Sequence, residues 1–203
     1  MVVVSFSDGG DRLVPSLVLH PTSTSQWHEL VREAAHSAEH RLDEELESYL
    51  VFLLMRFATN RGMASRVLAI DYLQGQLERG RIRQEKLRDV GDHCLLFSGL
   101  FPKLATRRRV RLSYFIDLGR GAYHQLSDEL THSLAETFAS LSESFVDLMD
   151  VLQAMRRMGR EDLALQPIEA FELWSATGSR AAFKAINKGV GAFPVRPDSD
   201  EIN

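Results

Sequence analysis

Apolar side chains recur at intervals of four, four, three, four, three, four and three residues over one long stretch of the C-terminal half. They are Leu130, Leu134, Phe138, Leu141, Phe145, Leu148, Leu152 and Met155. This heptad spacing places all eight on one side of an α-helix. Ser127 precedes the stretch as a candidate N-cap, and Arg156 and Arg157 close it, as the helix dipole favours. The pattern predicts one continuous helix with a buried seam.

Steps of three and four also run from Trp27 to Phe57, which predicts either one long helix or two helices joined near Asp43. The segment from Tyr49 onward is apolar all round, which indicates an enclosed helix. Further helices are predicted over 63–77, 81–100 (ending before Pro102), 167–174 and 179–187, the last capped by Ser179.

Residues 110–118 alternate like a strand, but Leu112, Phe115, Ile116, Gly119, Ala122, Tyr123 and Leu126 also form a helical face. Helix is favoured because no partner strand is available. Gly119 and Gly121 then cost stability unless a neighbouring helix packs closely there.

These elements predict an all-α fold, an antiparallel bundle of about seven helices around a single core. The expected organisation is an irregular lead-in over 1–25, a helical domain over 26–188 and a flexible tail over 189–203. A hairpin formed by residues 2–6 and 12–19 is an alternative for the lead-in.

The single cysteine, Cys94, excludes an intrachain disulfide and suits a reducing compartment. The longest apolar run, Tyr49–Met55, is too short to span a bilayer. The residues after Met1 lack the basic n-region of a signal peptide. We therefore expect a cytoplasmic protein without a membrane partner.

Charge is distributed unevenly. Residues 79–120 hold eleven Lys/Arg and four Asp/Glu, a balance of +7, whereas the rest of the chain holds 13 basic and 24 acidic residues. The basic middle is densest at Arg107, Arg108, Arg109 and Arg111, a candidate site for binding an anion or a protein partner. The favoured interpretation is pairing with an acidic surface, either the chain's own 128–150 face or a partner's. The low pI and the lack of interleaved aromatic residues argue against nucleic acid.

Two Glu-x-x-His pairs, Glu33–His36 and Glu129–His132, have the spacing of di-iron bundle ligands. The heptad places Glu129 and His132 outside the seam, and Glu33, His36 and His40 lie opposite the apolar stripe of their helix. Since such ligands must face inward, we expect no metal and no cofactor.

Asp89, Asp92 and His93 are the candidate catalytic residues. Asp89 and His93 lie one turn apart, so that the carboxylate could orient the imidazole. Adjacent Cys94 points about 100° away from His93 and lies on an apolar stripe, which favours a core cysteine over a nucleophile.

The segments VGDHCLLFSGLFP (90–102), SYFIDLGRGAY (113–123) and WSATGS (174–179) are similar to parts of a group of uncharacterised bacterial helical proteins. The resemblance implies a bacterial source and no particular activity.

The leading functional hypothesis is a non-enzymatic interaction or regulatory protein, working through a bundle surface with a basic middle patch and a protein partner or a second copy. One alternative is an enzyme or small-ligand binder with an enclosed pocket near Asp89–Phe101 and Tyr114–Tyr123. A nucleic-acid-binding module using the arginine cluster is the other alternative.

Overall fold

The computed structural model describes residues 5–7, 16–18, 24–59, 78–102, 111–158 and 165–190. Within these ranges the chain forms eight helices: α1 (Thr24–Ala38), α2 (Glu44–Thr59), α4 (Gly80–Leu100), α6 (Leu112–Glu129), α7 (His132–Glu143), α8 (Phe145–Arg157), α9 (Pro167–Thr177) and α10 (Arg180–Val190). The expected all-α bundle is confirmed. Eight described helices replace the seven or so that were expected, and the helix predicted over 63–77 lies outside the described residues.

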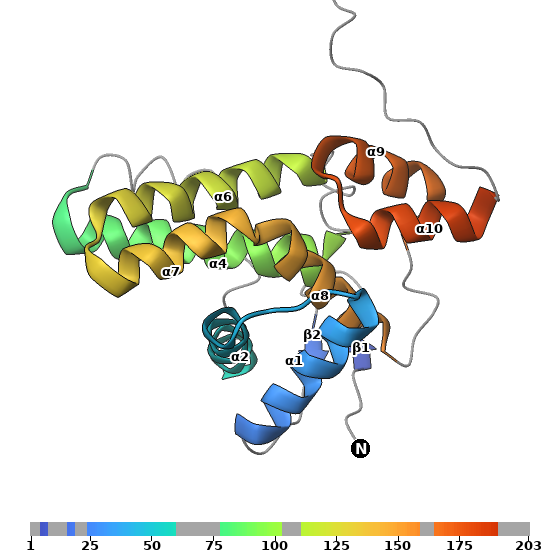
Figure 1. The fold of residues 1–203 in the computed structure, drawn as a ribbon, viewed down its shortest axis with the longest axis horizontal. Coiled ribbons are helices and arrows are strands. Elements are labelled where there is room, and N and C mark those ends of the chain that lie inside the picture. Colours follow the sequence, from blue (N-terminus) through green and yellow to red (C-terminus); the bar gives the residue numbers. More distant parts are fainter. Residues whose placement is uncertain are drawn as a thin grey trace, which may run out of the picture.

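The helices form three groups around α8 (Figure 1). Antiparallel α4, α6 and α7 lie side by side. α1 packs on another side of α8, and α2 packs against α1 and α7. The α9–α10 hairpin lies at the N-terminal end of α6. The core is one continuous cluster that includes Leu50, Leu95, Ile116, Leu148 and Ala182. α4, α6 and α8 all contact one another in it.

Glycines allow the central helices to approach closely. A Cβ at Gly91 would lie 2.3 Å from the Tyr123 ring, and one at Gly119 would lie 2.5 Å from the Phe145 ring. Real Cβ contacts are never this short, so both positions require glycine.

The choice of helix for 110–118 is confirmed, because α6 begins at Leu112 and buries the predicted face against α4. The predicted helix over 81–100 is also confirmed, and α4 ends at Leu100, just before Pro102. All residues from 90 to 102 are buried, so the second half of α4 is enclosed on every side. The apolar stripe in the sequence predicted only one buried side.

The prediction of one continuous seam helix is wrong, because the stretch is divided between α6, α7 and α8. Ser127 lies inside α6, and α7 starts at His132, which has a φ of 60°. A second interruption at Ser144 separates α7 from α8. The seam is buried from Phe138 onward, whereas Leu134 is 57% exposed.

Residues 26–57 form two helices joined just before Asp43, one of the two alternatives. Glu39 has a φ of 59° and ends α1 in a Schellman motif, in which its N–H bonds the His36 carbonyl and the His40 N–H bonds the Ala35 carbonyl. Asp43 caps α2 by accepting a 2.8 Å hydrogen bond from the Leu46 N–H.

The prediction that α2 is enclosed on all sides is wrong, because Phe52 is 61% exposed. At the N-terminus, strands β1 (Ser5–Ser7) and β2 (Ser16–Val18) pair antiparallel, which corresponds to the hairpin alternative. The division into lead-in, domain and tail remains a prediction. In the described part of the chain, no helix combines the length and the apolar character needed to cross a bilayer.

Candidate functional site

Asp92, one of the three candidate catalytic residues, is buried where α2, α4 and α6 meet. Its Oδ1 accepts hydrogen bonds from the hydroxyls of Tyr49 and Tyr123, both at 2.6 Å, and its Oδ2 accepts one from the Arg56 guanidinium. Burial raises the pKa of both tyrosines, so both hydroxyls stay protonated as donors. Burial alone would lower the pKa of Arg56, but the Asp92 charge outweighs it and raises that pKa. This cluster joins three helices through one satisfied carboxylate.

The other two candidates do not form the expected pair. The His93 ring is held through Nδ1, which lies 2.6 Å from the backbone carbonyl oxygen of Asp89 rather than from its carboxylate. His93 is 6% exposed, and its Nε2 has no hydrogen-bond partner among the described residues. The adjacent thiol of Cys94 is fully buried, and burial raises its pKa well above the usual range. The neutral, enclosed thiol behaves as a small apolar side chain.

A second buried carboxylate, Asp150 of α8, anchors the α9–α10 hairpin. It accepts hydrogen bonds from the Ser179 hydroxyl at 2.6 Å and from the Ala181 N–H at 3.1 Å, which lies at the start of α10. Ser179 Oγ in turn accepts from the Ala182 N–H, so the predicted cap is confirmed. The positive end of the helix dipole also favours this buried charge.

His40 contacts the same carboxylate, which contradicts the prediction that it faces outward. Its Nε2 lies 3.3 Å from Asp150 Oδ2, and its Nδ1 lies 3.4 Å from Asp147 Oδ1. The reason is local: α1 ends at Ala38, and the left-handed Glu39 turns the next residue toward α8. The prediction for His40 was wrong because it assumed that the helix continues to residue 40, whereas α1 ends at Ala38.

The Glu-x-x-His pairs are placed on the outside. Glu33, His36 and His132 are exposed, and Glu129, half-buried, pairs with Arg83. The break between α6 and α7 also separates Glu129 from His132. In the described ranges, no three His, Cys, Asp or Glu side chains are grouped as ligands for a metal ion.

Of the predicted arginine cluster, Arg107, Arg108 and Arg109 lie outside the described residues. Arg111 is exposed at the start of α6, where it lines a pocket together with Glu169 and Glu172 of α9. The acidic residues that share a pocket with Arg111 are therefore on α9. From the sequence, the 128–150 face was considered as the intramolecular partner of the cluster.

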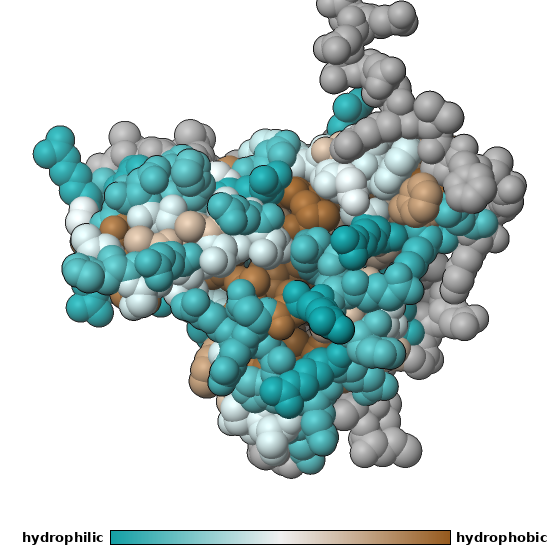
Figure 2. Space-filling view, in the orientation of Figure 1, coloured by the Kyte–Doolittle hydropathy of each residue, from teal (hydrophilic) through white to brown (hydrophobic). Residues whose placement is uncertain are grey.

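The outer side of the α9–α10 hairpin carries a row of aromatic rings that the sequence analysis missed. Phe171 and Trp174 have ring centroids 6.0 Å apart, and Trp174 and Phe183 have centroids 5.6 Å apart. Ile168, one turn before Phe171, is 76% exposed. On the right of Figure 2, hydrophobic atoms lie at the surface between these two helices. The sequence did contain a sign of this row, because Ile168, Phe171 and Trp174 are spaced three residues apart and therefore lie close together on a helix.

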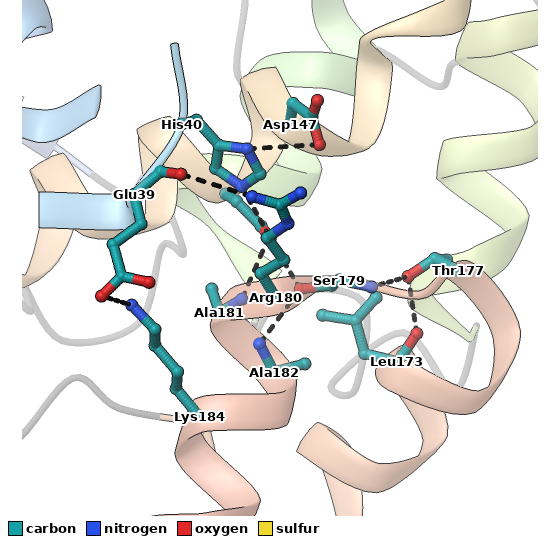
Figure 3. A network of polar contacts seen from close by, with 11 residues as sticks. Glu39, His40, Asp147, Leu173, Thr177, Ser179, Arg180, Ala181, Ala182 and Lys184 are labelled. Carbon is teal, nitrogen blue, oxygen red and sulfur yellow. Dashed lines mark hydrogen bonds and ion pairs between the residues drawn. The ribbon is translucent and has the colours of Figure 1, made fainter. Parts of the chain in front are cut away.

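Two cations border the row on α10. Arg180 and Lys184 line a groove of about 620 Å³ together with Phe183, Asn187 and Glu39. Lys184 forms a 2.6 Å ion pair with Glu39, and this hydrogen bond lowers the pKa of Glu39. Arg180 donates to the Glu39 backbone carbonyl (Figure 3). We call the row and these two cations, Ile168, Phe171, Trp174, Phe183, Arg180 and Lys184, the hairpin surface.

Comparison of the chain with protein-family models, with curated proteins and with solved structures finds no match.

Proposed function

We propose that the protein is a non-enzymatic interaction protein that binds a protein partner through the hairpin surface. The observation that carries the proposal is the row of Phe171, Trp174 and Phe183, which extends across two helices beside Arg180 and Lys184. Aromatic residues and arginine are enriched in interface centres. Contiguous apolar surface bordered by polar side chains is typical of a docking site.

The geometry favours a partner segment that is an acidic, amphipathic helix. Residues 168, 171 and 174 recur every three positions, so a second helix with apolar residues at i, i+3, i+4 and i+7 can lie along them. The cations at the border would meet acidic side chains on its flank. The existing Lys184–Glu39 pair does not prevent this, because Glu39 is 68% exposed and an exposed ion pair contributes only about 0–1 kcal/mol.

The hairpin surface is also held rigidly, which lowers the entropic cost of binding. The buried carboxylate of Asp150 bonds both the cap residue Ser179 and the Ala181 N–H, so α10 is fixed to α8. Gly178, with a φ of 75°, sets the tight connection between α9 and α10.

The test uses two designed helical peptides of about 18 residues, long enough to form an amphipathic helix on binding. Both carry the same leucine face, and their flanks are glutamate in one and lysine in the other. Trp174 fluorescence reports binding. We expect micromolar affinity for the acidic peptide, about tenfold or more weaker affinity for the basic one, and weakening with salt.

Two variants and a matched control localise the effect. Phe171→Asp should abolish binding, and Lys184→Glu should reverse the preference between the peptides. Phe52→Asp, a change at an exposed aromatic residue on α2, should leave binding unchanged. Equal affinity for both peptides, no binding of either, or an equal loss in Phe52→Asp would refute the proposal.

The basic middle patch remains a separate proposal, because three of its four arginines lie outside the described residues. Nucleic acid stays its competing ligand. A cytoplasmic location and a bacterial source are expectations from the sequence that suit an interaction protein.

A further inference from the structure

A pocket of about 420 Å³ lies between the start of α6 and the α9 helix. Its walls include Arg111 and Ser113 from α6, Leu165, and Glu169, Glu172 and Leu173 from α9. Figure 1 shows α9 beside this end of α6. The volume lies within the range of small-molecule sites. A site of this size suits a small molecule such as a free amino acid or a dipeptide.

The two walls carry opposite charges on different helices. Arg111 and Glu172 are both exposed, and neither side chain forms an ion pair with any described residue. Glu169 is half-buried, and its Oε2 accepts a 3.3 Å hydrogen bond from the Gln166 N–H at the start of α9. Both glutamates line the pocket, and the charge of Glu169 also acts on the buried Arg156 of α8. The negative charge that the α9 wall offers a ligand is therefore mainly that of Glu172, whereas the α6 wall is positive.

We infer that this pocket binds a small zwitterion, with the amino group on the glutamate wall and the carboxylate on Arg111. A ligand that is only an anion would be repelled by the Glu172 carboxylate, and one that is only a cation would be repelled by the guanidinium. A ligand with both charges matches both walls, and a guanidinium is well suited to a carboxylate because it can bind both oxygens.

The remaining walls indicate an apolar side chain on the ligand. Leu112, Leu165 and Leu173 line the pocket, as do Pro102 and Ala176. Burying an aliphatic side chain against these groups removes apolar surface from water on both molecules. The ligand class is therefore an amino acid or a dipeptide with aliphatic side chains.

This inference does not depend on the proposed function. The pocket uses Leu165 and the 169–172–173–176 side of α9, whereas the hairpin surface uses 168, 171 and 174. Substitutions on one side of the helix can therefore be made without removing residues of the other.

The test is calorimetric titration with three forms of one probe: leucyl-leucine, its N-acetylated form and its C-terminal amide. We expect the free dipeptide to bind with a Kd of roughly 10–1000 μM and each blocked form to bind about tenfold or more weakly. Glu172→Gln should weaken the free dipeptide by a similar factor and leave the acetylated form unchanged. Arg111→Gln should also weaken binding of the free dipeptide by about tenfold or more, and it should leave the affinity for the amide unchanged.

Glu143→Gln on α7 is the matched control, since it removes an exposed glutamate far from the pocket in the sequence and outside its lining. It should bind the free dipeptide as the parent protein does. Circular dichroism checks that each variant is folded, which is expected because all three side chains are exposed. Absence of dipeptide binding, or equal binding of the free and blocked forms, would overturn the inference.

Discussion

Gly119 and Gly121 lie two positions apart in α6 and experience opposite surroundings. A Cβ on Gly119 would meet the Phe145 ring at 2.5 Å and the Cys94 Cβ at 2.7 Å, whereas one on Gly121 would meet nothing within 4 Å. Gly119→Ala should therefore lower the free energy of unfolding by about 1–3 kcal/mol through overpacking. Gly121→Ala should raise it by about 0.5–1 kcal/mol, because alanine favours a helix.

Urea denaturation of the two variants measures both effects in one experiment. Their opposite signs are the important result, because both substitutions add the same methyl group to the same helix. An equal stabilisation of both would mean that α6 does not pack on Phe145 as described.

The two tyrosines that donate to Asp92 make stability sensitive to high pH. Burial raises the pKa of Tyr49 and Tyr123 well above the unfolded value of about 10. Above about pH 10 the folded state thus holds more protons than the unfolded state, and the free energy of unfolding must fall as pH rises. Buried Cys94 acts in the same direction. Arg156 acts in the opposite direction: burial lowers its pKa to about 10, so the folded state loses this proton before the unfolded state does, and this group raises the free energy of unfolding as pH rises.

Comparing single variants isolates the tyrosine effect. Denaturation of Tyr123→Phe between about pH 8 and 11 should show a shallower decline than the parent chain. Tyr114→Phe, a change at a tyrosine that is 45% exposed, should keep the parent slope. If the Tyr123 variant kept it as well, the phenol would have the same pKa in the folded and the unfolded state.

At the scale of elements, three leucines seven residues apart contrast the seam with its interruption. Leu141 of α7 and Leu148 of α8 are fully buried, whereas Leu134 of α7 is 57% exposed. Leu→Ala at either buried position should lower the free energy of unfolding by roughly 2–5 kcal/mol. The same change at Leu134 should cost less than about 1 kcal/mol, since little area is lost from the core.

Denaturant melts at two protein concentrations distinguish a core from an intermolecular seam. A loss that varies with concentration would indicate that the leucines stabilise an oligomer. Equal losses at Leu134 and Leu141 would show that the seam continues unbroken through α7, as the heptad spacing alone predicted.

At the scale of the whole molecule, the charge asymmetry bears on nucleic-acid binding. The basic middle lies within a chain of net charge −4, and the acidic remainder repels a polyanion at long range. We expect no binding to generic duplex DNA tighter than about 10 μM at physiological salt. The sequence predicts that Arg107, Arg108, Arg109 and Arg111 form an exposed patch. On that prediction, replacing the four with alanine should change stability little, because exposed ion pairs contribute about 0–1 kcal/mol each.

Fluorescence anisotropy with labelled duplex DNA over a salt series provides the measurement. Submicromolar binding that falls steeply with salt and disappears in the four-alanine variant would favour the nucleic-acid-binding alternative.

Local chemistry was sufficient to predict most helices and several of their ends. Intervals of three and four residues predicted the buried faces of α4 and α6, and Pro102 predicted where α4 ends. Ser179 was predicted as a cap because its short hydroxyl side chain satisfies an N–H at a helix start. These features involve residues within about one helical turn of each other, and the sequence alone therefore determines them.

The tertiary structure decided which helices meet and which polar groups are enclosed. Periodicity did not reveal the break at Ser144, because the apolar spacing continues through it. It placed His40 outside, although the left-handed Glu39 turns that ring toward Asp150, 110 positions later in the chain. The hairpin surface and the α6–α9 pocket likewise combine side chains from separate helices. Such groupings depend on contacts between distant segments, which a local repeat does not encode.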